Sequence, residues 1–218
     1  MPDFSALREQ MVERHIRARG IDDPAILDAF RSVPRELFVA DTMAAYAYDD
    51  GPLPIGAGQT ISQPYIVALM IAAGEVKRGD RVLEVGAGSG YAAALLSRIA
   101  ERVVAIERLP ELAQAARERL AALGVVNVEV VDGDGTAGWG QCAPYDSILV
   151  AAAGRQVPQP LVEQLGAGGR LVIPVGGIHG IQELIKVTKA RDGTLSHVSL
   201  GGVRFVPLIG AEGDRRGS

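Results

Sequence analysis

Cysteine, histidine and excess positive charge are all scarce in this chain of 218 residues. The single cysteine, Cys142, cannot form a disulfide within the chain and predicts a reducing compartment, which we take to be the cytoplasm. The three histidines show no metal-ligand spacing, so we expect no metal site. Acidic residues outnumber basic ones, 26 to 22, and no basic stripe occurs, which argues against a nucleic-acid partner.

Long hydrophobic runs are also missing. The most apolar stretch, PYIVALMIAAGEV, is too short to cross a membrane and ends in a charge. The first residues, MPDFSALREQ, lack the basic and apolar regions of a signal peptide. Hydrophobic residues nevertheless make up 48% of the chain, which is typical of a globular protein. We expect one soluble domain over residues 1–210 and a disordered polar tail over 211–218.

The first 75 residues predict a helical extension that ends in an irregular loop. Apolar side chains recur at helical spacing over residues 4–19, and Gly20 is a natural end to that helix. Asp23 and Pro24 have the residue types of an N-cap and a first helical position. Residues 45–62 are rich in glycine and proline and read as irregular, after which the chain returns to helix.

From residue 81 onward, strand patterns alternate with helix patterns. The expected strands are 81–85, 102–107, 128–134, 145–153 and 170–176, with helices at 90–100, 109–124 and 158–165 between them. Alternation of this kind predicts an α/β fold with a doubly wound, mostly parallel Rossmann-like sheet and helices on both faces. Residues 182–190 and 195–208, joined by RDGT, predict an antiparallel hairpin. We expect a cofactor-binding core at 76–176 and C-terminal strands at 177–210.

A glycine loop follows the first strand of this core, in the sequence VLEVGAGSGY. Gly86, Gly88 and Gly90 would let a ligand approach the backbone at the start of a helix, where free N–H groups point outward. The bulky Tyr91 stands where the dinucleotide fingerprint wants a small residue, which disfavours a nicotinamide-dependent oxidoreductase. A tight turn that binds nothing is the alternative.

Three acids lie in or at the end of neighbouring strands. Glu84 is inside the first strand, Glu107 ends the second and Asp132 ends the third. Ligands bind at the carboxyl ends of such strands, where a carboxylate can accept both hydroxyls of a ribose. Carboxylates disfavour a phosphate-rich ligand and favour a cationic one. S-adenosylmethionine fits, with Glu107 at its ribose and Asp132 at its adenine amine. Taken singly, each acid could be a surface carboxylate.

The same half of the chain resembles the class I methyltransferases. VLEVGAGSGY resembles their first motif, VVAIE the second, YDSILVAAA the fourth-strand motif and LGAGGRLVIPVG the fifth. Such motifs specify the cofactor and leave the methyl acceptor undefined.

The segment PLPIGAGQTISQPYIVALM is the most specific in the sequence. It resembles the signature of the protein-L-isoaspartate O-methyltransferases, as do RGIDDPAILDAFRSVPRELFV before it and VRFVPLIG near the end. The resemblance implies S-adenosylmethionine-dependent methylation of the free α-carboxylate of L-isoaspartyl residues in damaged proteins. The resulting ester returns to normal aspartate through a succinimide. The implied partners are therefore damaged proteins and peptides, and we expect a monomer.

The resemblance also implies the site residues. Ser62 and Thr60 would orient the reacting carboxylate, and Val203, Phe205 and Val206, together with Ser62, would contact the substrate along an extended edge. The cofactor would contact Gln59, Thr60, Ile61, Ser62, Glu84, Gly86, Gly88, Gly90, Glu107, Arg108, Asp132 and Gly133. Read without the family, Ser62 and Thr60 could be turn or cap hydroxyls, with Ser62 as the N-cap of the next helix.

Three other functions remain open from the sequence. The chain could methylate a small carboxylate or another acceptor. It could bind S-adenosylmethionine without turnover, although GQTIS would then serve no purpose. A nucleotide-dependent oxidoreductase is the weakest rival because of Tyr91.

Overall fold

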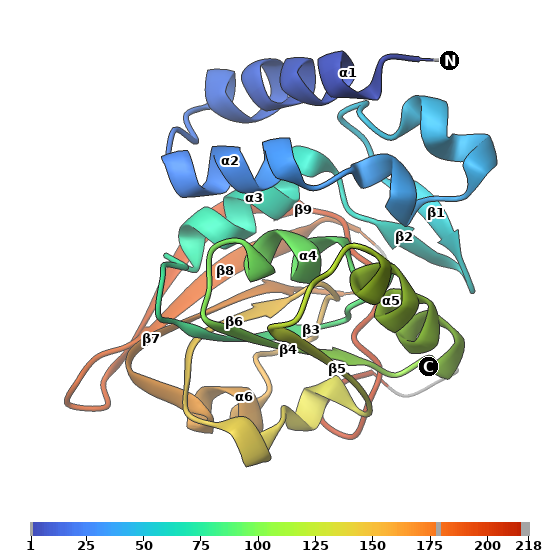
Figure 1. Ribbon diagram of the computed structural model, residues 1–218. Helices are drawn as coiled ribbons and strands as arrows, with labels where there is room; N and C mark the ends of the chain where they lie inside the picture. The colour runs from blue at the N-terminus through green and yellow to red at the C-terminus, as the bar shows by residue number, and fades with distance from the viewer. Residues whose placement is uncertain (1, 178–179, 215–218) are drawn as a thin grey trace.

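The computed structural model describes residues 2–177 and 180–214 and builds an α/β fold around a seven-stranded sheet (Figure 1). The strand order is β5-β4-β3-β6-β7-β8-β9. The strands are β3 (Arg81–Val85), β4 (Arg102–Glu107), β5 (Val128–Asp132), β6 (Tyr145–Val150), β7 (Leu165–Val175), β8 (Gln182–Lys189) and β9 (Leu195–Val203). Neighbours from β5 to β7 pair in parallel, and β8 is antiparallel to both β7 and β9. The predicted sheet is confirmed.

Helices cover both faces of the sheet, as predicted. In Figure 1, α3 (Pro64–Ala73), α4 (Tyr91–Ser97) and α5 (Pro110–Ala122) lie on one face and α6 (Gln159–Glu163) lies on the other. Successive strand residues point to opposite faces, so Val82 and Leu83 of β3 enter two different hydrophobic cores. This double burial explains why the central strands read as nearly continuous apolar runs.

The N-terminal extension forms a further helical layer. The predicted first helix is present, but only α1 (Phe4–Met11) is α-helical; η1 (Val12–Ile16) is a π turn and η2 (Arg17–Arg19) a 3-10 turn. The Asp23 carboxylate accepts from Ala25 N at 2.8 Å and caps α2 (Pro24–Ser32) as expected. Two short 3-10 turns follow, η3 (Arg35–Phe38) and η4 (Asp41–Tyr46).

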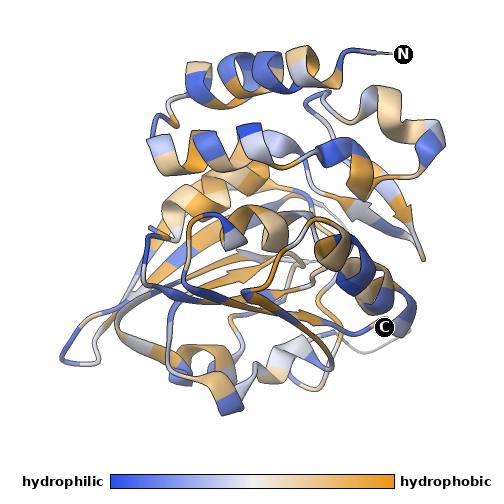
Figure 2. Cartoon of the chain, in the orientation of Figure 1, coloured by the Kyte–Doolittle hydropathy of each residue, from blue (hydrophilic) through white to orange (hydrophobic). Residues whose placement is uncertain are grey.

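Helix α3 lies between this layer and the sheet. Figure 2 shows it orange along its length, whereas the outer surfaces of α1 and α5 are largely blue. A helix that is apolar on all sides is expected to be buried on all sides. Its first residue is Pro64 and its N-cap is Gln63, which makes no side-chain cap hydrogen bond. The expectation that Ser62 is the N-cap is therefore wrong by one residue.

The segment before α3 is more regular than its composition indicated. Strands β1 (Leu53–Gly56) and β2 (Gln59–Ile61) pair as a small antiparallel hairpin outside the main sheet. Its two-residue turn has positive φ at both Ala57 and Gly58, the geometry of the tight turns that match strand twist. Alanine seldom adopts such a φ, so the sequence gives little warning of this turn.

The predicted disordered tail is ordered over its first residues. Asp214 is buried, donates its N–H to Leu208 O at 2.7 Å and pairs with Arg155 Nε at 2.6 Å. The remaining tail, residues 215–218, lies outside the described residues. Within residues 2–177 and 180–214, none of the helices has the length and apolar character needed to span a membrane.

Candidate active site

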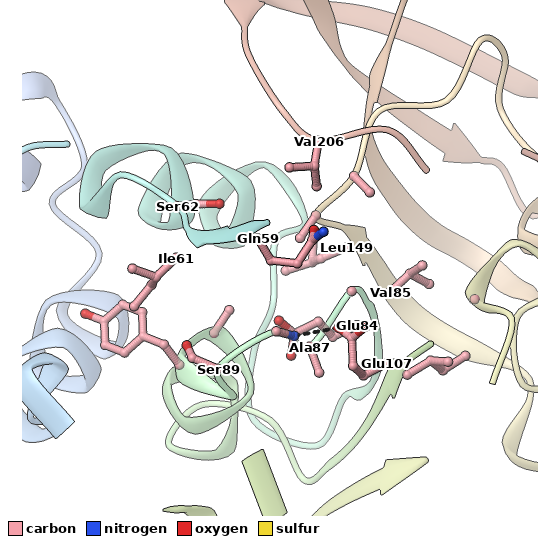
Figure 3. Close-up of a pocket in the computed structure, with 18 of the residues that line it drawn as sticks. Gln59, Ile61, Ser62, Glu84, Val85, Ala87, Ser89, Glu107, Leu149 and Val206 are labelled. Atoms are coloured by element: carbon pink, nitrogen blue, oxygen red, sulfur yellow. Dashed lines mark hydrogen bonds between the residues drawn. The ribbon is translucent and has the colours of Figure 1, made fainter. Parts of the chain in front are cut away.

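A pocket opens at the carboxyl ends of β3 and β4, where the glycine loop passes from β3 into α4 (Figure 3). Gly86, Gly88 and Gly90 all adopt positive φ, of 90°, 53° and 88°, which non-glycine residues rarely tolerate. At Gly90 an added Cβ would also lie 3.2 Å from Ala116 Cβ, where α4 and α5 meet. The loop thus needs glycine for its path, and Gly90 also for helix packing.

Glu107, the last residue of β4, holds this loop in place. One carboxylate oxygen accepts from Gly88 N at 2.9 Å, drawn as the dashed line in Figure 3, and the other accepts from Leu109 N at 2.9 Å. The side chain is only 6% exposed and lines the pocket. Hydrogen bonds from backbone N–H groups to an ionised carboxylate are among the stronger ones in proteins, so Glu107 organises the glycine loop before any ligand binds.

Glu84, a residue of β3, is a buried carboxyl group that lines the pocket. It is 2% exposed, and its Oε2 has no hydrogen-bond partner among the described residues. Burial, with the nearby Glu107 charge adding to it, raises the pKa of Glu84 to about 8. A buried carboxyl without a partner costs free energy unless a ligand supplies one. Glu84 is therefore ready to accept a hydrogen bond from a donor, preferably a cation, inside the pocket.

The opposite side of the pocket carries no charge. We call it the neutral wall: residues 59–62, from β2 and the turn into α3, and residues 206–209 near the C-terminus. We call the facing side, made of Glu84, the loop at residues 85–89, Glu107 and Arg108, the glycine-loop wall. In sequence, residues 59–62 precede the glycine-loop wall and residues 206–209 follow it, so the pocket is assembled only in the folded chain.

The C-terminal part of the neutral wall is tied down by the loop after β5. Asp134 accepts from Thr136 N at 2.9 Å, from Thr136 Oγ1 at 2.6 Å and from Ala211 N at 2.7 Å. Burial opposes ionisation of Asp134, but these hydrogen bonds keep its pKa below the ordinary value. Thr136 belongs to η5 (Gly135–Ala137), which precedes η6 (Gly140–Cys142). Ala211, just after the C-terminal part of the neutral wall, is therefore held at the loop that follows β5.

Most of the predicted site residues line this one pocket. Those that do are Gln59, Thr60, Ile61, Ser62, Glu84, Gly86, Gly88, Glu107, Arg108 and Val206. Five do not: Gly90, Asp132, Gly133, Val203 and Phe205. Gly90 lies at the contact between α4 and α5, and Gly133 N donates to Glu107 O at 3.0 Å.

The predicted contact of Asp132 with an adenine amine stays a prediction, but the structure gives this carboxylate another partner. The Asp132 carboxylate pairs with Arg117 Nη2 at 3.0 Å, and its side chain is 49% exposed. It is the last residue of β5 and is not among the residues that line the pocket. Asp132 does end β5, as the sequence predicts. The direction of its side chain depends on the pleat of the strand and on the ion pair with Arg117.

The main-chain groups of Phe205, at the predicted substrate edge, already have hydrogen-bond partners within the chain. Phe205 N donates to Gln182 Oε1 at 2.9 Å, and Phe205 O accepts from Gln182 Nε2 at 3.5 Å. The main chain of Val206 is used too, because its carbonyl accepts from Ala153 N at 2.8 Å. The Phe205 main chain therefore already has a side-chain partner in Gln182, whereas the Val206 side chain reaches the pocket, as Figure 3 shows.

Several lining residues were missed from the sequence. They include Val67, Met70, Ile71, Ser89, Tyr91, Leu149, Ala151 and the segment 207–209. The residues of α3 have the spacing of a core-facing helix stripe, and that spacing does not distinguish a core from a pocket floor. Ala151, directly after β6, could have been found, since the carboxyl end of each neighbouring parallel strand is a candidate ligand contact.

The sheet, the glycine loop after its first parallel strand and the acid ending the next strand define a class I S-adenosylmethionine-dependent methyltransferase. The comparisons with known proteins narrow the class. The protein-L-isoaspartate(D-aspartate) O-methyltransferase family matches residues 6–213, and the chain belongs to this family. The family and the cofactor that the sequence predicted are confirmed.

Relatives of known sequence and structure agree. A protein-L-isoaspartate O-methyltransferase of Methanoculleus marisnigri is 57% identical over 206 residues, covering 94% of this chain and 93% of that one. A solved protein-L-isoaspartate O-methyltransferase superposes with a TM-score of 0.86 at 31% identity, covering 94% of this chain and 67% of the other. A Plasmodium falciparum structure, described as a candidate member in complex with S-adenosyl-L-homocysteine, gives 0.80 at 25% identity, covering 93% and 98%.

Proposed function

We propose that this protein repairs damaged polypeptides by methylating the free α-carboxylate of L-isoaspartyl residues, with S-adenosylmethionine as methyl donor. The observation that carries the proposal is the pairing of a charged glycine-loop wall with a neutral wall in one pocket, in a chain of this family. The first wall suits a cationic nucleoside and the second suits an anionic acceptor that must stay reactive.

The glycine-loop wall would hold the cofactor. Gly86 and Gly88 allow close approach of the ligand, Glu107 would accept the ribose hydroxyls, and Arg108 lies beside it. The partnerless Oε2 of Glu84 fits an ammonium group, which would also lower the pKa of Glu84 from about 8. When bound, S-adenosylmethionine supplies an electrophilic methyl group on a cationic sulfur. The relative that holds S-adenosyl-L-homocysteine supports this assignment.

The neutral wall would hold the acceptor. A carboxylate with an ordinary pKa near 4 is already ionised at neutral pH, so no general base is required. The residues need only align one carboxylate oxygen with the methyl carbon and exclude water, and alignment can contribute roughly 7–11 kcal/mol to a rate. Ser62 and Thr60 can donate hydrogen bonds for this purpose. An acid on this wall would repel the substrate, and a basic residue would reduce its nucleophilicity.

The polypeptide around the isoaspartyl residue would lie along residues 203–206. The Phe205 main chain is already hydrogen-bonded to Gln182. We therefore propose that the substrate polypeptide contacts the side chains of Phe205 and Val206 and the backbone at Val203. After transfer, the methyl ester can close to a succinimide with loss of methanol, and water then opens the ring to aspartate or isoaspartate. That step needs no group of this protein.

The test is methyl transfer from radiolabelled S-adenosylmethionine to two peptides that differ at one site. One carries isoaspartate there and the other carries aspartate. Base-labile label on the isoaspartyl peptide alone supports the proposal. Cofactor binding without label on either peptide would reject the repair function and reopen the search for another carboxylate acceptor.

We further propose that the protein works in the cytoplasm as a monomer. The single cysteine suits a reducing compartment, and both walls of the pocket come from one chain. Light scattering coupled to gel filtration measures the mass in solution. A dimer whose dissociation abolishes activity would reject the monomer.

A further inference from the structure

Arg35, the first residue of η3, is a buried cation that the proposed reaction does not use directly. It is 0% exposed, and burial lowers its pKa from the ordinary value. Among the described residues no carboxylate lies within ion-pair distance of it. Apolar replacements of buried charges are often neutral or stabilising, so stability alone does not account for a buried arginine without an ion pair.

The hydrogen bonds of Arg35 lead to the neutral wall. Its Nε donates to Ala47 O at 2.7 Å, and its Nη2 donates to Ser62 O at 2.9 Å. The same guanidinium stacks over the Tyr91 ring, with 4.8 Å from Cζ to the ring centroid. Tyr91 directly follows the glycine loop and lines the pocket. Arg35 therefore contacts the neutral wall at Ser62 and, through Tyr91, the start of α4 directly after the glycine loop.

Asp50 holds the next residue in a similar way. Its Oδ2 accepts from Gln63 Nε2 at 2.7 Å and from Arg19 Nη1 at 3.0 Å. Helix α3 begins at Pro64 without a side-chain cap, so its helix contacts the turn at Ser62 and Gln63 only through the main-chain bond from Val67 N to Gln63 O at 3.1 Å. The bonds from Arg35 and Asp50 come from the N-terminal extension.

We propose that Arg35 is a positioning residue for methyl transfer: by bridging the Ser62 carbonyl and the Tyr91 ring, it sets the Ser62 hydroxyl relative to the cofactor loop. Asp50 acts in the same sense through Gln63. The inference rests on the role proposed above for Ser62. It also gives the N-terminal layer a function in the reaction, beyond covering α3.

The decisive variant is Arg35→Lys, because a lysine keeps the charge but lacks the fork that reaches two carbonyls at once. We expect the kcat of the folded enzyme on isoaspartyl peptide to fall about 10- to 100-fold, the cost of a misplacement near 1 Å. The calorimetric Kd for S-adenosyl-L-homocysteine should stay within about twofold, since the glycine-loop wall is intact. An unchanged kcat, or a loss of cofactor binding equal to the loss of kcat, overturns the proposal.

Arg8→Met is the matched control. Arg8 donates to Tyr48 and to the Arg31 carbonyl within the N-terminal layer and pairs with Glu36, but makes no bond to residues 59–65 in the described structure. It should lower the melting temperature and leave the kcat of folded enzyme unchanged. If Arg8→Met and Arg35→Lys reduce kcat equally, Arg35 is structural and the proposal fails.

A double-mutant cycle tests whether Arg35 acts through Ser62. Ser62→Ala should reduce kcat in the natural chain and reduce it much less in the Arg35→Lys background. Equal reductions in both backgrounds overturn the inference while leaving the role of Ser62 intact. No effect of Ser62→Ala in the natural chain would reject that role and the inference together, whereas the labelled-peptide test judges the repair function separately.

Asp50→Ala decides the question if Arg35 variants do not fold, which circular dichroism would reveal. The Asp50 side chain is 20% exposed, so its loss is better tolerated. We expect a smaller fall in kcat with an unchanged cofactor Kd, and a weaker effect of Ser62→Ala in this background. The proposal would be overturned if Asp50→Ala left kcat unchanged and Ser62→Ala lowered kcat as much in this background as in the natural chain.

Discussion

The glycine-loop wall carries three ionisable side chains, Glu84, Glu107 and Arg108, whereas the neutral wall at residues 59–62 and 206–209 carries none. The charged wall is part of the sheet and its motif is shared across the methyltransferase class. The neutral wall comes from segments before and after the cofactor core, and its resemblance is to one family. Binding and chemistry are thus divided between different parts of the chain, and variants should separate them.

The largest expected effect is on the glycine-loop wall. Glu107→Ala removes the acceptor for Gly88 N and Leu109 N as well as the proposed ribose contact. Two hydrogen bonds to a charged group together correspond to about 100-fold in affinity, so calorimetry should show a Kd for S-adenosyl-L-homocysteine raised by that factor. Glu129→Ala, which removes an exposed partner of Arg102, serves as the control. An unchanged Kd would remove Glu107 from the cofactor site.

A smaller effect of the opposite kind is expected on the neutral wall. Ser62→Ala should lower kcat about tenfold, the value of one hydrogen bond to a charged group, and leave cofactor binding unchanged. Steady-state kinetics with isoaspartyl peptide and calorimetry with S-adenosyl-L-homocysteine measure the two quantities. If cofactor affinity collapsed along with kcat, Ser62 would belong to the other wall.

The two acids of the glycine-loop wall differ in their hydrogen bonds: Glu107 accepts two from backbone N–H groups, whereas Glu84 Oε2 has no partner among the described residues. Its folded-state pKa of about 8 lies above the ordinary value of 4.5, so between these values the unfolded chain is ionised and the folded chain is not. The stability associated with the protonated form of Glu84 is fully present below the ordinary pKa and is lost as the pH rises through about 8. Relative to Glu84→Gln, the free energy of unfolding should fall by about 1.4 kcal/mol per pH unit in this window. Urea unfolding across that range checks it; parallel pH profiles for the two proteins would contradict it.

The smallest effect is expected at Asp132, which ends β5 but is not among the residues that line the pocket. Asp132→Asn should change the cofactor Kd by less than about twofold, because only a surface ion pair with Arg117 is lost. A tenfold weaker Kd in the same calorimetric assay would show that the side chain turns into the pocket when the cofactor binds, and would support the contact predicted from the sequence.

Some parts of the fold and of the site can be predicted from the sequence, and others cannot. The glycine loop, the parallel strands and the Asp23 cap follow from local chemistry, because positive φ, double burial and capping each favour few residue types. The direction of Asp132, the use of the Phe205 main chain and the ordering of Asp214 depend on partners distant in sequence: Arg117, Gln182 and Arg155. The β1–β2 hairpin was missed because its turn uses Ala57 at positive φ.

The place of residues 206–209 in the chain has a consequence for truncated forms of the protein. These residues form part of the neutral wall and follow all seven strands of the sheet in sequence. A chain cut after β9 keeps every strand and the whole glycine-loop wall but loses one side of the pocket. A complete sheet is therefore not sufficient for a complete pocket, and truncation after β9 separates the two.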